Sequence, residues 1–152
     1  MTVRAFIGIG GNLGDARETV ERAMVDLGAL PKTRIKARSS LYRTAPVNAT
    51  GPDFINAVVE LDTDLEPHAL LAELQRLEAV AGRERPYRNA PRTLDLDLLR
   101  HGDALMESET LTLPHPRLNE RAFVLLPLAE IAPDQVTSGQ IDKVSGQRIE
   151  RL

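Results

Sequence analysis

The chain has 152 residues, a formal net charge of −3 and no cysteine, which excludes disulfides, thiol catalysis and cysteine-bound zinc. Its 42% hydrophobic and 27% charged residues are typical of a folded globular protein, and its acidic balance argues against a general nucleic-acid binder. No apolar run is long enough to cross a membrane and no secretory leader is evident, so we expect a single cytoplasmic domain over residues 1–152.

A strand, a glycine-rich turn and a helix are predicted at the start of the chain. Residues 3–9 alternate well enough for a strand with one apolar face. The glycines of residues 8–14 do not have the spacing of a dinucleotide-binding fingerprint, so we interpret them as a tight turn. Asp15 is a suitable N-cap for a helix over residues 16–27, whose apolar stripe predicts a core-facing surface.

Two more strands and a second helix are expected next. Residues 33–44 and 54–61 both alternate apolar and polar side chains, and turn-forming residues separate them. A helix is predicted over residues 67–81, where Pro67 is tolerated in the first turn. Its regularly spaced leucines predict a buried stripe.

Residues 83–99 contain most of the polar chemistry. The alternation of residues 93–99 predicts a strand with Asp95 and Asp97 on one face, roughly 7 Å apart along the chain. Such carboxylates repel each other unless a cation lies between them or one is protonated, and hard oxygen ligands suit magnesium. The preceding loop, interrupted by two prolines, carries four arginines: Arg83, Arg85, Arg88 and Arg92. Guanidinium groups bind phosphate oxygens bidentately, so the stretch is typical of phosphoryl-type transfer. The alternative is a solvated edge strand beside an exposed arginine loop.

The last part of the chain is predicted to contain a turn at residues 100–103 and an apolar helix over residues 121–131. Between them, His115 and Arg121 are donors suited to a phosphate tail. Residues 135–152 are assigned no function. The alternation of strand, helix, strand, strand, helix and strand predicts an α+β fold with a mostly antiparallel sheet.

Three segments resemble one enzyme family. Residues 92–99, Arg-Thr-Leu-Asp-Leu-Asp-Leu-Leu, closely resemble the signature of the 6-hydroxymethyl-7,8-dihydropterin pyrophosphokinases of folate biosynthesis. Residues 39–47 resemble the family's Ser-Ser-x-Tyr-x-Thr-x-Pro segment, and residues 114–123 its Pro-His-x-x-x-x-x-Arg-x-Phe segment. The chain departs from the family at Asn89, where many members carry tryptophan. The resemblance implies a ferredoxin-like α/β sandwich and transfer of the β,γ-diphosphate of ATP to the pterin hydroxymethyl group, leaving AMP.

The resemblance also implies roles for individual residues. The catalytic residues would be Arg83, Arg92, Asp95 and Asp97, and the two aspartates would hold two magnesium ions. The residues that bind ATP would be Gln75, Glu78, Arg85, Arg88, Leu98, Thr112, His115 and Arg121. The residues that bind the pterin would be Thr44, Ala45, Val47, Phe54, Asn56 and Phe123, with the two phenylalanines on opposite faces of the ring. We expect a monomer that binds these two small molecules and neither nucleic acid nor a membrane.

Two other function classes stay open at this point. A metal-dependent phosphodiesterase would use the same aspartate pair without any pterin. An RNA-binding module on a ferredoxin-like sheet is the second alternative. The acidic composition and the lack of an aromatic strand motif disfavour it.

Overall fold

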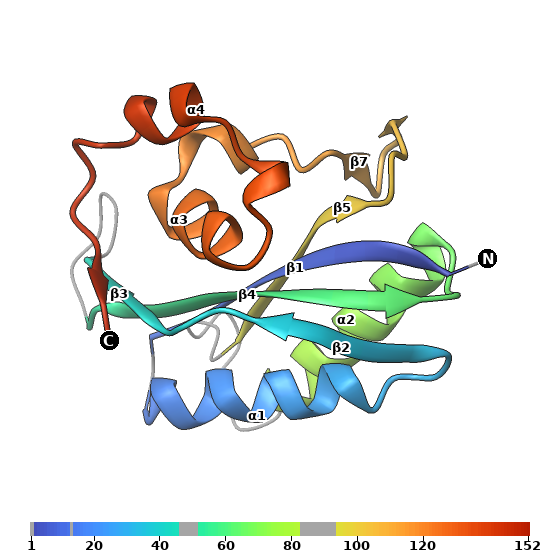
Figure 1. Cartoon of the computed structure of the whole chain (residues 1–152). Coiled ribbons are helices and arrows are strands. Elements are labelled where there is room, and N and C mark those ends of the chain that lie inside the picture. The colour runs from blue at the N-terminus through green and yellow to red at the C-terminus, as the bar shows by residue number, and fades with distance from the viewer. Residues whose placement is uncertain (1, 13, 46–51, 83–93) are drawn as a thin grey trace.

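The sheet of this protein lies between two layers of helices (Figure 1). The computed structural model describes residues 2–12, 14–45, 52–82 and 94–152. Helices α1 and α2 cover one face of the sheet, and α3 and α4 lie over the other. The bounds are α1 (Ala16–Gly28), α2 (Pro67–Gly82), α3 (Ala122–Ile131) and α4 (Ser138–Lys143). None of the helices in these residues is both long enough and apolar enough to span a membrane.

Six strands form the main sheet in the spatial order β5-β1-β4-β3-β8, and β2 also pairs with β4. Every pairing is antiparallel. The strands are β1 (Val3–Gly11), β2 (Thr33–Arg38), β3 (Tyr42–Thr44), β4 (Phe54–Thr63), β5 (Asp95–His101) and β8 (Glu150–Arg151). A separate hairpin joins β6 (Met106–Glu107) to β7 (Thr112–Leu113). The βαββαβ order with both crossover helices on one face is the ferredoxin-like arrangement, so the expected fold is confirmed.

Alternating side chains of the two central strands divide the core into two layers. Ile7 and Val59 point toward α1 and α2, and Phe6 and Val58 point toward α3; all four are at most 2% exposed. The sequence predicts this period-two alternation but only one apolar face, whereas in the structure both faces of the two strands are buried. Both faces of the sheet are therefore held by packed helices. The part of the sheet beside the N-terminus of α3 can thus provide a rigid support for a site.

One predicted strand is wrong in its extent. Residues 33–44 form two strands, β2 and β3, because the chain leaves the ladder at Ser39. There the backbone N–H of Ser39 donates to the carbonyl of Val58 at 2.9 Å, and its Oγ accepts from the N–H of Val58 at 2.9 Å. A register shift between Ile35 and Ala37 already bends β2. As a result, β3 pairs with the opposite end of β4 from β2.

The predicted turn at residues 100–103 is also shifted. Arg100 and His101 belong to β5, and the turn comes at Gly102, whose φ of +54° favours glycine. The last helix that the sequence predicts, α3, begins at Ala122 with Arg121 as its N-cap. Elements without a predicted counterpart are η1 (Leu118–Glu120), η2 (Pro133–Gln135), α4 and the strands β6, β7 and β8.

Candidate active site

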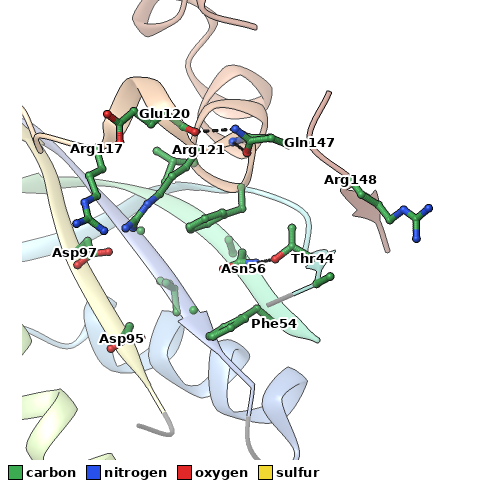
Figure 2. Close-up of a pocket in the computed structure, with 18 residues that line it drawn as sticks. Thr44, Phe54, Asn56, Asp95, Asp97, Arg117, Glu120, Arg121, Gln147 and Arg148 are labelled. Carbon is green, nitrogen blue, oxygen red and sulfur yellow. Dashed lines mark hydrogen bonds between the residues drawn. The ribbon is translucent and has the colours of Figure 1, made fainter. Parts of the chain in front are cut away.

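A cavity of about 820 Å³ opens on the α3 face of the sheet (Figure 2). Its floor is formed by β1, β4 and β5, and its walls by the end of β3, the start of α3 and two residues near the C-terminus. The lining residues are Gly8, Ile9, Gly10, Thr44, Ala45, Phe54, Asn56, Ala57, Asp95, Asp97, Arg117, Glu120, Arg121, Ala122, Phe123, Val124, Gln147 and Arg148.

The two aspartates open into this cavity because of their neighbours on β1. Asp95 lies opposite Gly10 and Asp97 opposite Gly8. Since glycine has no side chain, nothing on β1 covers the carboxylates. The leucines that alternate with them are buried on the other face of β5, as the sequence predicts.

The carboxylate pair fits a magnesium site in its ligand chemistry. Within residues 2–12, 14–45, 52–82 and 94–152 there is no group of three or more histidine, aspartate or glutamate side chains that could hold a metal. Magnesium usually takes one or two protein carboxylates and completes its shell with water and phosphate oxygens. Asp95 and Asp97 on one wall of an open cavity are such a partial ligand set.

Glu78 of α2 fixes the segment between the two aspartates. Its Oε2 accepts a hydrogen bond from the backbone N–H of Leu96 at 2.8 Å. Because N–H groups alternate between the two edges of a strand, Leu98 presents its backbone to the same outer edge of β5. The side chain of Leu98 is buried in the core, so only its backbone could meet a ligand.

The structure does not bring all predicted nucleotide residues into the cavity. Gln75, Glu78, Leu98, Thr112 and His115 are absent from its lining. Gln75 is exposed on α2 and Thr112 lies on β7. Both α2 and β7 pack against β5, which is the edge strand of the sheet. The structure therefore places the two elements that carry Gln75, Glu78 and Thr112 against β5, the strand that carries the aspartates.

His115 lies next to the aspartate pair. Its backbone N–H donates to the carbonyl of Leu99 at 2.9 Å, and its Nε2 is 3.9 Å from Oδ1 of Asp97. The N–H of Arg117 donates to Nδ1 at 3.2 Å, which places the proton of the neutral ring on Nε2, toward Asp97. Burial lowers the pKa of His115, and Arg121 and Arg117 lower it further against the opposing effect of Asp97. The neutral imidazole can thus donate a hydrogen bond from Nε2 on the side of Asp97.

Two arginines and an aromatic ring form the wall opposite the sheet. Arg121 and Arg117 point toward Asp97 in Figure 2. The guanidinium of Arg121 lies 5.3 Å from the centroid of the Phe123 ring, a cation–π contact. Sequence reasoning assigned no role to Arg117; its only signal is a cation two residues after His115.

The predicted pterin residues that the structure describes meet at the other end of the cavity. Thr44, Ala45, Phe54, Asn56 and Phe123 all line it. Asn56 is 4% exposed, and its Nδ2 donates to Oγ1 of Thr44 at 2.9 Å. That bond fixes the amide orientation and leaves Oδ1 on the cavity side, beside Gly10.

Several predicted residues lie outside the described part of the chain: Arg83, Arg85, Arg88, Arg92 and Val47, together with Asn89. Conversely, Glu120, Gln147 and Arg148 line the cavity without having been predicted. Gln147 and Arg148 belong to residues 135–152, to which no function was assigned from the sequence. After α4 the chain passes beside the cavity, and this brings both residues to its lining.

The comparisons with known proteins agree with one another. The family model of 7,8-dihydro-6-hydroxymethylpterin-pyrophosphokinase (HPPK) matches residues 6–133. A relative from Methylorubrum extorquens is 44% identical over 155 residues, with 98% of each chain covered. One from Pseudomonas aeruginosa is 44% identical over 135 residues, covering 88% of this chain and 83% of the relative. Both carry the name 2-amino-4-hydroxy-6-hydroxymethyldihydropteridine pyrophosphokinase.

Solved structures resemble this one in fold. The crystal structure of wild-type Plasmodium falciparum HPPK-DHPS matches with a TM-score of 0.66 at 15% identity. The match covers 88% of this chain and 42% of that one, so this chain spans about two fifths of the length of the solved protein. At that identity the likeness concerns the fold.

Proposed function

We propose roles for the residues of this cavity from the premise that the chain belongs to the 7,8-dihydro-6-hydroxymethylpterin-pyrophosphokinase (HPPK) family. The protein is a pyrophosphokinase of folate biosynthesis that uses ATP. The hydroxymethyl oxygen of 6-hydroxymethyl-7,8-dihydropterin attacks the β-phosphorus of ATP. The bond from that phosphorus to the α,β-bridging oxygen breaks, AMP leaves, and the hydroxyl proton is released.

The proposal rests on one observation: carboxylates, arginines, two phenylalanine rings and a buried asparagine all line the same cavity. Asp95 and Asp97 lie at one end, and Phe54 and Asn56 lie at the other. A volume of about 820 Å³ falls in the range of small-molecule sites, roughly 300–1,000 Å³. The cavity is therefore suited to hold a flat ring with its hydroxymethyl group directed toward the phosphate-binding groups.

The pterin end would bind by stacking and by amide hydrogen bonds. Phe54 and Phe123 offer ring faces, which favour a flat heterocycle between them. The Asn56 amide, oriented by Thr44, presents an acceptor to the ring edge. The backbone around Ala45 and Val47 would complete the recognition of the ring.

The phosphate end would combine two magnesium ions with cationic side chains. Asp95 and Asp97 would hold the ions, which neutralise phosphate charge and lower the pKa of the attacking hydroxyl. Arg121 and the neutral Nε2–H of His115 would donate to the phosphate tail, and Arg117 would add a further charge. Arg83 and Arg92 would neutralise the charge that develops on the leaving oxygen.

The nucleotide would extend from the cavity along the outer edge of β5. Leu98 would bind the base through its backbone, since its side chain is in the core. Gln75 and Thr112 flank that edge from α2 and β7, and Glu78 holds the strand there. Arg85 and Arg88 would contact the phosphates from the preceding loop. We further propose that residues 1–152 act as one cytoplasmic domain and as a monomer.

Phosphorus NMR tests the reaction and its alternatives together. The purified protein is incubated with magnesium and ATP, with and without 6-hydroxymethyl-7,8-dihydropterin. AMP and a pterin diphosphate are expected only when the pterin is present, and removal of magnesium with EDTA stops the reaction. ADP would indicate γ-phosphoryl transfer and refute attack at the β-phosphorus. AMP formed without pterin would indicate a phosphodiesterase or pyrophosphatase.

A further inference from the structure

The carboxamide of Gln147 bridges the two peptide groups on either side of Arg121. Its Oε1 accepts from the backbone N–H of Ala122 at 2.9 Å, and its Nε2 donates to the carbonyl of Glu120 at 2.7 Å (Figure 2). Arg121 is thus held between two hydrogen bonds from a residue 26 positions later in the chain, counted from 121 to 147. No other described side chain makes this pair of contacts.

The start of α3 needs such a partner from outside the helix. The first N–H groups of a helix have no intrahelical acceptor, and the N-cap side chain usually supplies one. Here the N-cap is Arg121, whose backbone is extended (φ −124°, ψ 116°) and whose side chain makes no capping bond. Gln147 accepts from Ala122 instead. A guanidinium has no acceptor and could not cap this N–H, and that of Arg121 lies over the ring of Phe123 at the cavity.

Gln147 itself sits on an anchored segment. Just before it, Val144 is buried at 3% exposure against α3. Just after it, β8 pairs with β3, and the N–H of Leu152 donates to the carbonyl of Leu41 at 2.9 Å. Because the segment is fixed on both sides, its carboxamide has a defined position relative to the sheet.

We propose that Gln147 is a positioning residue of the pyrophosphokinase site. It caps α3 from outside, fixes the backbone of Arg121, and so directs Arg121 into the cavity. The inference rests on the proposed role of Arg121 in phosphate binding. It gives the C-terminal segment, residues 144–152, a part in transfer that its sequence does not signal.

A double-mutant cycle between Gln147 and Arg121 tests this inference, with kcat/KM for pterin diphosphate formation as the readout. We expect Gln147→Ala to lower kcat/KM about tenfold, as for the loss of one to two hydrogen bonds. In an Arg121→Ala background the same change should cost less than about twofold, because the residue being positioned is already gone. Gln140→Ala is the matched control, since that amide bonds to Thr137 and Asn119 at the same end of the molecule but outside the cavity. It should change kcat/KM less than about twofold in both backgrounds.

A conservative variant keeps the test valid if Gln147→Ala lowers stability. Gln147→Glu retains an acceptor for Ala122, and a carboxylate is favourable at a helix N-terminus, but it loses the donor to the carbonyl of Glu120. It should retain an activity between that of the wild type and that of Gln147→Ala, with Tm measured alongside for every variant. Equal losses in the two Arg121 backgrounds, no loss for Gln147→Ala, or a Gln147→Glu variant as impaired as Gln147→Ala would each overturn the inference. Formation of pterin diphosphate by the wild-type protein tests the proposed function, independently of the role of Gln147.

Discussion

Removal of the Glu130 carboxylate is expected to loosen β3, the strand that carries Thr44 of the predicted pterin site. Glu130, near the end of α3, accepts hydrogen bonds from the N–H of Ser40 at 3.0 Å, from Ser40 Oγ at 2.9 Å and from the Tyr42 hydroxyl at 2.7 Å. A longer contact of 3.5 Å joins it to Arg151 of β8. One carboxylate thus connects α3 to both β3 and β8.

The size of the effect follows from the number and kind of these bonds. Hydrogen bonds to a charged acceptor contribute about 1.5–3 kcal/mol each, and the Glu130 side chain is 22% exposed, so water replaces part of what is lost. For Glu130→Ala we expect a loss of about 3 kcal/mol in the free energy of unfolding. Tyr42→Phe removes one of the bonds and should lose about 1–2 kcal/mol. Since β3 carries Thr44, the KM for the pterin should rise with little change in the KM for ATP.

Urea denaturation at pH 7 measures these losses. Glu73→Ala is the matched control, because Glu73 is also a helix glutamate with short bonds, and within the described part of the chain these go only to Arg76 on the same helix surface. Such an exposed pair should contribute less than about 0.5 kcal/mol. In the Glu130→Ala background, Tyr42→Phe should cost much less than it does alone. A Glu130→Ala loss no larger than that of Glu73→Ala, or strict additivity with Tyr42→Phe, would refute the reasoning.

Three further predictions concern the metal pair, the cavity floor and alkaline pH. Asp97→Asn should lower turnover about 10²- to 10³-fold at saturating magnesium with an unchanged circular dichroism spectrum, and full activity would refute the metal assignment. Gly10→Ala would place a Cβ 3.1 Å from Oδ1 of Asn56, so the KM for the pterin should rise about tenfold, whereas Gly139→Ala, on α4, should leave it unchanged. Burial and the hydrogen bond to Glu130 raise the pKa of Tyr42 from about 10 to about 12, so the folded state favours the neutral phenol. The stability that this provides is present below about pH 10 and is lost as pH rises toward about 12, a decline that urea titrations should find reduced in Tyr42→Phe.

The sequence predicts the core of this fold because the core is built from local periodicity. Local spacing of apolar residues is enough to predict buried side chains in three segments. These are the alternating residues 3–9 and 54–61 and the apolar stripe of residues 16–27. The aspartates of β5 are predictable for the same reason. The division of residues 33–44 is not, because Ser39 leaves the strand through bonds to Val58 on another strand.

The site was predictable only where family motifs or strand faces mark it. Asp97, Asn56 and Phe123 lie in recognisable patterns and do line the cavity. In sequence, Glu130 is an ordinary helix-surface residue and Gln147 an ordinary loop residue, and their contacts span long stretches of chain. Their positions depend on how α3 docks on the sheet, which no local pattern encodes. Leu98 is the reverse case, since its side chain is buried in the core and only its backbone could fill the role that the family motif predicts.

The strand β8 is synthesised near the end of the chain, and this has a consequence for folding on the ribosome. The strand β3 is made at residues 42–44, but the strand that covers its free edge comes only at residues 150–151. At translation rates of about 5–20 residues per second, that edge lacks its partner for roughly 5–20 s. An uncovered strand edge is a template for pairing with other chains, so the newly made protein is most prone to aggregate during this interval. A chaperone that binds extended segments would protect it there, and completion of the last strand would release it.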